Sequence, residues 1–312
     1  MVHGRHATVP PMRVGVSGGT VNEGTIDQVI AEARTAEADG FASYWVSQIF
    51  GMDALTALAI VGREVPRIEL GTGVVPTYPR HPMMLAQQGL TTNEATGGRL
   101  CLGIGLSHKI VIENMMGMSY DKPVRHLRDY LSVLGPLVHD GAVSYTGEVY
   151  TTHASLTNPG RRAFPILVAA LGEQMLRVTA RLADGTVTWC TGPSTLASHI
   201  VPTITSEAEA AGRPAPRVVT LLPVCVTDDA NGARERAAQI FAIYGQLPSY
   251  RAMLDREGAA GPADVAIVGS ATEVAERVAA LADVGVTDFV ASEFPANADE
   301  AAATREALKS VL

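Results

Sequence analysis

Short apolar segments alternate with segments of helical periodicity along almost the whole chain, and this alternation restricts the fold more than any other feature. Parallel strands need long crossover connections, so the pattern predicts an α/β fold with a parallel sheet. Eight expected strands, all separated by helices, favour a (β/α)8 TIM barrel. The strands are expected at 12–17, 41–47, 68–75, 99–104, 166–170, 186–190, 217–226 and 287–292. The helices are expected at 26–38, 54–64, 82–96, 124–138, 173–183, 194–211, within 230–256, at 272–284 and from residue 299.

The alternation is interrupted once, around residues 141–163, where 142–150 has strand character. This stretch is interpreted as an insertion in the barrel. Residues 1–11 (MVHGRHATVPP) are expected to form a disordered tail, which leaves 12–312 as a single barrel domain. The Ala/Gly/Pro-rich stretch 258–264 is expected to be a flexible loop and is not treated as a domain boundary.

Composition excludes several classes of protein. A hydrophobic fraction of 47% allows a large core, and a net charge of −8 argues against nonspecific binding to nucleic acid. Three widely spaced cysteines, Cys101, Cys190 and Cys225, give neither a disulfide framework nor zinc-ligand spacing. Together with the lack of a signal peptide or a long apolar run, they predict a cytoplasmic protein without a membrane anchor.

The active site of such a barrel lies at the carboxyl ends of the strands. One candidate there is the segment from Ala169 to Gly172, which leads directly into the helix expected from Glu173. Free N–H groups at a helix start, with a glycine that permits close approach, suit a phosphate. The alternative is that Gly172 only closes a tight turn between strand and helix.

A second candidate is the segment Gly103 to His108, GIGLSH, which follows an expected buried strand. His108 could donate or accept a proton near neutral pH, and the alternative is a solvated loop histidine. The segment lacks the third glycine of a dinucleotide fingerprint. Metal-ligand, GxSxG and GxxxxGK[ST] motifs are also absent from the sequence, which argues against a metal site, a hydrolase and a nucleotide triphosphatase. Strand ends rich in Gly, Thr, Ser, Tyr and Trp instead suit an aromatic cofactor.

The sequence resembles the bacterial-luciferase-like flavoproteins, in the branch of oxidoreductases that use the deazaflavin coenzyme F420. The resemblance covers nearly the whole chain and implies a TIM barrel of the luciferase-like type. It is carried by the segments GFASYWVSQIFGMDALTALA (40–59), LGTGVVPTYPRHPMMLAQQ (70–88), GGRLCLGIGLSHK (97–109), ILVAALGEQMLRVTARLADGTVTW (166–189) and FAIYGQLPSYRAMLDREG (241–258).

The resemblance also implies a cofactor site. Gly73-Val74 would lie at a bulge behind the ring, where relatives often have a cis peptide bond, and Thr72 would line the ring edge. Ala170, Leu171 and Gly172 would bind the cofactor phosphate through their N–H groups. The complete expected cofactor site comprises Ser47, Gln48, Thr72, Gly73, Val74, Ser107, His108, Ala169, Ala170, Leu171, Gly172 and Thr191.

The sequence departs from the sugar-phosphate dehydrogenases of this family at two positions. These enzymes have an Asp-His pair where this chain has Gln48-Ile49, and a Glu where it has His108. Glucose 6-phosphate is therefore not expected as substrate. His108, Gln48 and Tyr244 are the expected catalytic residues: a proton donor or acceptor, a group that orients the ring, and a substrate contact. Tyr244 and Tyr250 could instead belong to a core stripe on a helix.

The leading hypothesis is an oxidoreductase that transfers a hydride between F420 and an uncharged, fairly apolar small-molecule substrate. One alternative is an FMN-dependent monooxygenase fed by a separate reductase, and another is a catalytically silent protein that binds flavin or deazaflavin. The family further implies a homodimer packed through helices 54–64 and 82–96. Leu55, Leu58, Leu85 and Leu90 are its candidate interface residues, although the same leucines could face the strands.

Overall fold

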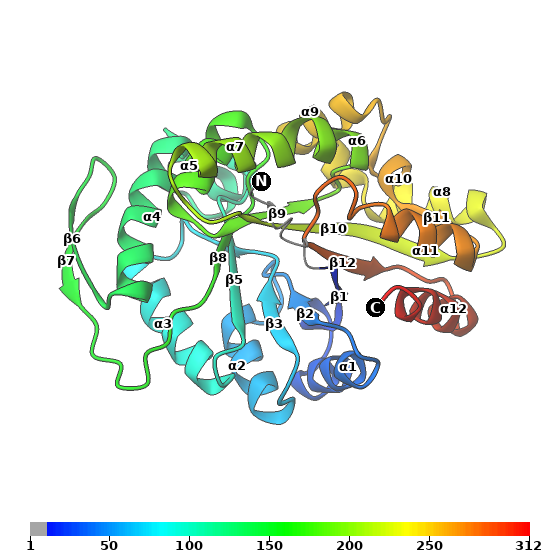
Figure 1. Ribbon diagram of the computed structural model, residues 1–312, viewed down its shortest axis with the longest axis horizontal. Helices are drawn as coiled ribbons and strands as arrows, with labels where there is room; N and C mark the ends of the chain where they lie inside the picture. Colours follow the sequence, from blue (N-terminus) through cyan, green and yellow to red (C-terminus); the bar gives the residue numbers. More distant parts are fainter. Residues whose placement is uncertain (1–10) are drawn as a thin grey trace, which may run out of the picture.

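The computed structural model describes residues 11–312, in which parallel strands form a closed barrel surrounded by helices (Figure 1). The main sheet has 10 strands; β4 (Val75–Pro76) and β11 (Ile267–Gly269) each pair with one neighbour, and the other eight close on themselves through the β9–β10 pairing. The barrel strands are β1 (Arg13–Gly18), β2 (Ser43–Val46), β3 (Glu69–Thr72), β5 (Leu100–Gly105), β8 (Ile166–Val168), β9 (Gly185–Trp189), β10 (Arg217–Val226) and β12 (Asp288–Glu293). The predicted (β/α)8 barrel and the positions of its eight strands are confirmed.

Several of the helices between these strands begin at a side-chain cap. Thr25 and Gln28 form a capping box at the first helix, and the Asp53 carboxylate accepts from the Thr56 N–H at the second. The long helices are α1 (Ile26–Ala38), α2 (Ala54–Glu64), α3 (Pro82–Ala95), α4 (Pro123–His139), α5 (Glu173–Leu182), α7 (Val201–Ala210), α8 (Ala230–Ile240), α9 (Pro248–Glu257), α11 (Ala271–Ala279) and α12 (Ala298–Lys309).

The structure refines the prediction in three places. The helix expected at 194–211 is divided into α6 (Pro193–Thr195), the π-helical η3 (Leu196–Ile200) and α7, and the region 230–256 is divided into α8, η4 (Ala242–Gly245) and α9. The stretch 258–264 was wrongly expected to be a flexible loop throughout. It leads into α10 (Pro262–Val265), and Arg251 donates to the carbonyls of Ala259 and Ala260, which holds the turn in place. The remaining short helices are η1 (Thr20–Asn22) and the π-helical η2 (Val111–Met115).

The insertion around 141–163 is an antiparallel hairpin of β6 (Ala142–Thr146) and β7 (Thr151–Ser155), separate from the barrel sheet (Figure 1). The buried carboxylate of Asp129 on α4 holds it, since it accepts from the Val149 N–H at 2.8 Å and the Tyr145 hydroxyl at 2.8 Å. Of the predicted tail 1–11, residues 1–10 lie outside the described residues. The assignment of 12–312 to a single domain stays a prediction.

The core has two layers, because successive side chains of a barrel strand point to opposite faces. On β5, Leu100, Leu102 and Ile104 pack toward the helices, whereas Cys101 lies in the barrel interior. Trp189 lies at the end of the interior layer, packs against it and is only partly buried. The interior layer consists of Trp45, Cys101, Leu167, Val187, Val219, Leu221 and Val290.

Ion pairs close the barrel at the amino ends of its strands. The Arg217 guanidinium on β10 contacts Asp288 Oδ1 on β12 at 2.6 Å and Glu69 Oε1 on β3 at 3.0 Å. Arg13 on β1 contacts the same two carboxylates at 3.2 Å each. The Asp288 side chain is only 2% exposed, so its charge depends on these two arginines for compensation.

Replacing Arg217 with methionine is expected to lower the free energy of unfolding by about 3 kcal/mol, because the buried Asp288 carboxylate loses a close partner. Denaturant titration of the variant and the wild type measures the difference. The matched control is Arg34→Met, whose exposed pair with Glu64 should contribute no more than about 0.5 kcal/mol. Equal effects of the two substitutions would contradict the interpretation.

Candidate active site

The floor of the candidate site is the open end of the barrel interior. Val74, Ala169 and Trp189 are partly buried there, packed on the interior layer. They come from three neighbouring regions: the end of β3, the end of β8 and the end of β9. The Gly73-Val74 peptide bond is cis, as the resemblance implied. The floor is therefore apolar except for the Trp189 indole N–H.

Two glycines on β5 allow the floor to form. A Cβ on Gly105 would lie 2.6 Å from Val74 Cγ2 and 3.3 Å from Ala169 Cβ, and one on Gly103 would lie 2.0 Å from the Thr72 carbonyl oxygen. Thr72 is fully buried, and its hydroxyl both donates to the Gly103 carbonyl at 2.8 Å and accepts from the Gly103 N–H at 2.9 Å. The Thr72 side chain thus links β3 to β5 in this structure, and its contact with a cofactor ring stays a prediction.

In the segment 169–172, side chains bind the carbonyl groups of Ala170 and Leu171. The Thr186 hydroxyl donates to the Ala170 carbonyl at 3.2 Å, and His199 Nε2 lies 2.8 Å from the Leu171 carbonyl oxygen. A carbonyl oxygen can only accept, so His199 donates from Nε2 in this contact.

The helix α5 starts at once after this segment. Among the described residues no side chain caps it, and a Cβ on Gly172 would meet nothing within 4 Å. The uncapped N–H groups of the first turn, next to the open space at Gly172, fit a phosphate.

His108 lies at the end of β5, on a turn with unusual backbone geometry. Ser107, just before it, has a φ of +60° in the left-handed region. The imidazole is half-buried, its ring centroid lies 5.8 Å from that of Tyr250, and burial lowers the pKa of His108 below its ordinary value of 6.5. The imidazole is therefore mainly neutral at pH 7.

Aromatic rings connect His108 to the floor. Tyr250 on α9 meets Tyr244 on η4 with 5.2 Å between centroids, and Tyr244 meets Trp189 at 5.6 Å. Burial raises the pKa of Tyr244, so its hydroxyl stays protonated at neutral pH. The buried Trp189 Nε1 makes no well-formed hydrogen bond among residues 11–312, although its N–H is near enough to the Tyr244 hydroxyl to offset part of the rise in the pKa of Tyr244. We call His108, Tyr250, Tyr244 and Trp189 the aromatic wall.

Sequence reasoning missed Trp189. The usable signal is the parity of the expected strand 186–190: Val187 and Trp189 point to the same face, and that face is the interior. By contrast, Tyr244 and Tyr250 were predicted near the pocket, and the structure joins them to His108.

The other predicted contacts are engaged with the protein itself. Gln48 Oε1 accepts from the Ala54 N–H at 3.1 Å at the start of α2, and Ser47 Oγ accepts from Asn22 Nδ2 at 3.4 Å. Thr191 is fully buried, and its hydroxyl donates to the Trp189 carbonyl at 3.3 Å. None of these three side chains touches the aromatic wall through a hydrogen bond among the described residues, and their roles in cofactor binding stay predictions.

A family model described as luciferase-like monooxygenase matches residues 11–288. The chain belongs to this family. A 5,10-methylenetetrahydromethanopterin reductase of Archaeoglobus fulgidus is 31% identical over 153 residues, a match that spans 49% of this chain and only 46% of that relative. The reductase of the same name from Methanolobus tindarius is 25% identical over 288 residues and covers 83% of this chain and 88% of its own.

Solved structures of luciferase-like proteins are similar to this chain in fold. An F420-dependent secondary alcohol dehydrogenase in complex with an F420-acetone adduct has a TM-score of 0.80 at 17% identity, over 97% of this chain and 98% of its own. The oxygenating constituent of 3,6-diketocamphane monooxygenase from Pseudomonas putida, in complex with FMN, has a TM-score of 0.73 at 17% identity, over 96% of both chains. At these identities the two structures confirm the luciferase-like barrel and nothing finer.

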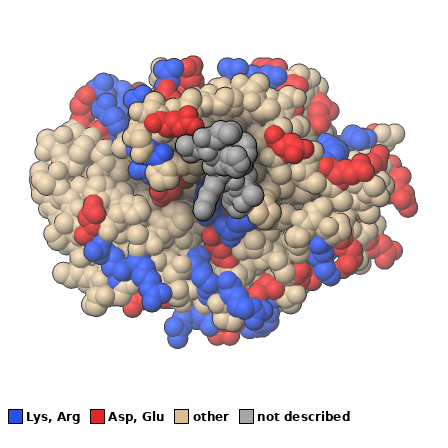
Figure 2. All heavy atoms as spheres, viewed as in Figure 1, with Lys and Arg blue, Asp and Glu red and all other residues tan. Residues whose placement is uncertain are grey.

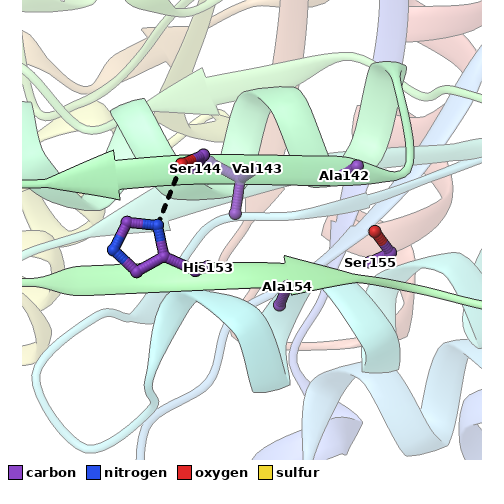
Figure 3. A pocket seen from close by; sticks show the side chains of 6 residues that line it. All are labelled: Ala142, Val143, Ser144, His153, Ala154 and Ser155. Atoms are coloured by element: carbon purple, nitrogen blue, oxygen red, sulfur yellow. Dashed lines mark hydrogen bonds between the residues drawn. The ribbon is translucent and has the colours of Figure 1, made fainter.

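Basic and acidic side chains are interspersed over the face in Figure 2. A shallow hollow lies on the β6–β7 hairpin, where Ser144 Oγ and His153 Nδ1 are 2.9 Å apart (Figure 3). Both side chains belong to the insertion, and none of the predicted site residues lines the hollow. Within residues 11–312 no cluster of three or more His, Cys, Asp or Glu could hold a metal, and no helix is long and apolar enough to cross a membrane.

Proposed function

We propose that this luciferase-like protein is an F420-dependent oxidoreductase that transfers a hydride between the deazaflavin and an uncharged, fairly apolar organic substrate. The methylenetetrahydromethanopterin reductases among its relatives and the F420-dependent alcohol dehydrogenase fold support the choice of cofactor. The observation that carries the proposal is the arrangement at the barrel mouth. An apolar floor and an uncapped helix start occupy adjacent strand ends, and the aromatic wall stands beside them.

The residues present fit such a cofactor. The N–H groups of Ala170, Leu171 and Gly172 would hold its phosphate, and Val74 would lie behind its ring. The Trp189 N–H, which makes no well-formed hydrogen bond among the described residues, is a donor that a bound molecule could use. When bound, the deazaflavin supplies the carbon that donates or accepts the hydride. Ser47, Gln48, Thr72, Ser107 and Thr191 complete the proposed surroundings.

The protein's own contribution to the reaction is proton transfer by His108. Its neutral imidazole at pH 7 is a base ready to accept a proton from an alcohol, and its protonated form is the acid needed in the direction of reduction. Tyr244 would contact the substrate from the wall. The three other wall residues carry no formal charge, and His108 is mainly neutral, which favours a neutral substrate over a sugar phosphate.

The second candidate is an FMN-dependent monooxygenase that needs a reductase partner. The FMN-bound monooxygenase with the same barrel favours it, because FMN also presents a ring and a phosphate to such a site. The third is a silent protein that binds either cofactor without turnover.

Parallel titration with F420 and FMN tests these alternatives. We expect F420 to bind tightly, as measured by the fluorescence of the cofactor. We also expect the reduced, bound cofactor to be as stable under air as under nitrogen. Tight binding of FMN with rapid oxygen consumption would instead establish the monooxygenase. Binding without a spectral change over a panel of enones, imines and alcohols would establish the silent protein.

The pH dependence of turnover tests His108. For oxidation, the rate is expected to fall as the pH drops through the lowered pKa of His108, because the protonated imidazole cannot accept a proton. For reduction the slope has the opposite sign. His108→Gln should flatten both profiles and reduce kcat by about 100-fold, measured as initial rates across the acidic and neutral range. An unchanged profile in the variant would remove His108 from the mechanism.

We also propose a homodimer through α2 and α3. The predicted interface leucines, Leu55, Leu58, Leu85 and Leu90, are at most 2% exposed within one chain, so they face the strands. The exposed large hydrophobic side chains on α2 and α3 are Ile60 at 43% and Met84 at 48%. Light scattering is expected to give twice the chain mass and, for Met84→Glu, a monomer. A monomeric wild type would contradict the proposal.

The three cysteines are free and buried in the described structure, which supports the proposal of a cytoplasmic, reducing location. Fractionation of cells that express the protein checks this proposal. Recovery outside the cytoplasm would contradict it.

A further inference from the structure

The turn that carries His108 is held from outside the barrel. The Thr77 N–H donates to the Gly105 carbonyl at 2.9 Å, and the Tyr120 hydroxyl donates to the Ser107 carbonyl at 3.2 Å. Ser107, with its φ of +60°, lies between these two contacts. A left-handed conformation is costly for serine, so it persists only where the surroundings fix it.

Tyr120 is in turn fixed by a stack of rings. Its ring lies 5.1 Å from that of Tyr78 at an interplanar angle of 25°, and Tyr78 lies 3.9 Å from His126 at 7°. His126 Nε2 and Thr77 Oγ1 are 2.9 Å apart, which ties this stack to the segment that also holds Gly105. His126 is 2% exposed, and burial lowers its pKa to about 4, so it is neutral at pH 7. We call Thr77, Tyr78, Tyr120 and His126 the turn clamp.

We propose that Tyr120 is a positioning residue for His108, acting through its hydrogen bond to the Ser107 carbonyl. The importance of Tyr120 for turnover rests on the proposed function. Its effect on the position of the His108 imidazole does not. The peptide group whose oxygen Tyr120 binds joins Ser107 to His108, so the hydrogen bond fixes the plane from which the His108 side chain departs.

Loss of this one hydroxyl has a defined consequence. The Ser107 carbonyl loses its donor, and the peptide is free to leave the left-handed conformation. The imidazole then moves out of the half-buried place beside Tyr250 toward water. Tyr250 on α9, which packs on the imidazole, is uncharged at neutral pH, and Lys109, the next residue in the chain, pairs with Glu113. Burial is the cause of the lowered pKa of His108. The expected change in the pKa of His108 is therefore due mainly to solvation of the imidazole.

The test compares Tyr120→Phe with Tyr150→Phe in the cofactor-free protein. Tyr150 also packs on His126, with centroids 5.5 Å apart, but makes no contact with the turn of His108 among the described hydrogen bonds. The pKa of His108 is measured by NMR of labelled histidine, with the resonance assigned by its loss in His108→Gln. We expect the pKa to rise toward 6.5 in Tyr120→Phe and to stay at the wild-type value in Tyr150→Phe.

Several outcomes overturn the inference: an unchanged pKa in Tyr120→Phe, or an equal shift in the two variants. If Tyr120→Phe does not fold, Ser107→Thr makes the left-handed conformation at this position costlier without changing the ring stack, and the same rise in the pKa of His108 is expected there. Once a substrate is known, Tyr120→Phe should reduce kcat by on the order of tenfold with little change in KM. Because the NMR measurement uses no cofactor, failure of F420 binding leaves it intact.

Discussion

The barrel depends on compensation of charge at its amino end. Strands that close into a ring bring their first residues together, and here these residues carry ionised groups from β1, β3, β10 and β12. The two arginines and two carboxylates share contacts in all four combinations, so no charge is left alone in a place with little water. With this end closed by ion pairs, the interior layer above it can be apolar, and the opposite end is left free for chemistry.

The carboxyl end is organised by glycines and hydrogen bonds to the backbone. Gly103 and Gly105 let Thr72 and Val74 approach β5 more closely than any side chain would allow. Thr186 and His199 hold the carbonyls that precede α5. The polar side chains of Thr72, Thr186 and His199 thus bind main-chain atoms of the barrel.

The sequence predicted the barrel and the position of each barrel strand, because alternating strands and helices in a parallel sheet have few other solutions. The sequence alone does not determine which way an individual side chain faces. Leu55 and Leu85 fit an interface as well as a core until the barrel showed them facing inward. Gln48 was expected to orient a ring, which stays a prediction; the structure adds that its side-chain oxygen accepts from the Ala54 N–H at the start of α2. Trp189 was not predicted because alternate residues of a strand face opposite sides, and the sequence does not say which side is the interior. Tyr120 was not predicted because its hydrogen-bond partner is a backbone carbonyl, which leaves no pattern in the sequence.

The two tryptophans give the molecule a built-in optical contrast. Trp45 is completely buried deep in the barrel interior, and its Nε1 donates to Ser43 Oγ at 2.8 Å. Trp189 lies on the same axis at the mouth, partly exposed and with its N–H unpaired among the described residues. One indole therefore has a fixed environment, whereas the environment of the other changes with whatever occupies the floor. The emission of the unmodified protein already contains both a reference and a reporter for occupancy of the site.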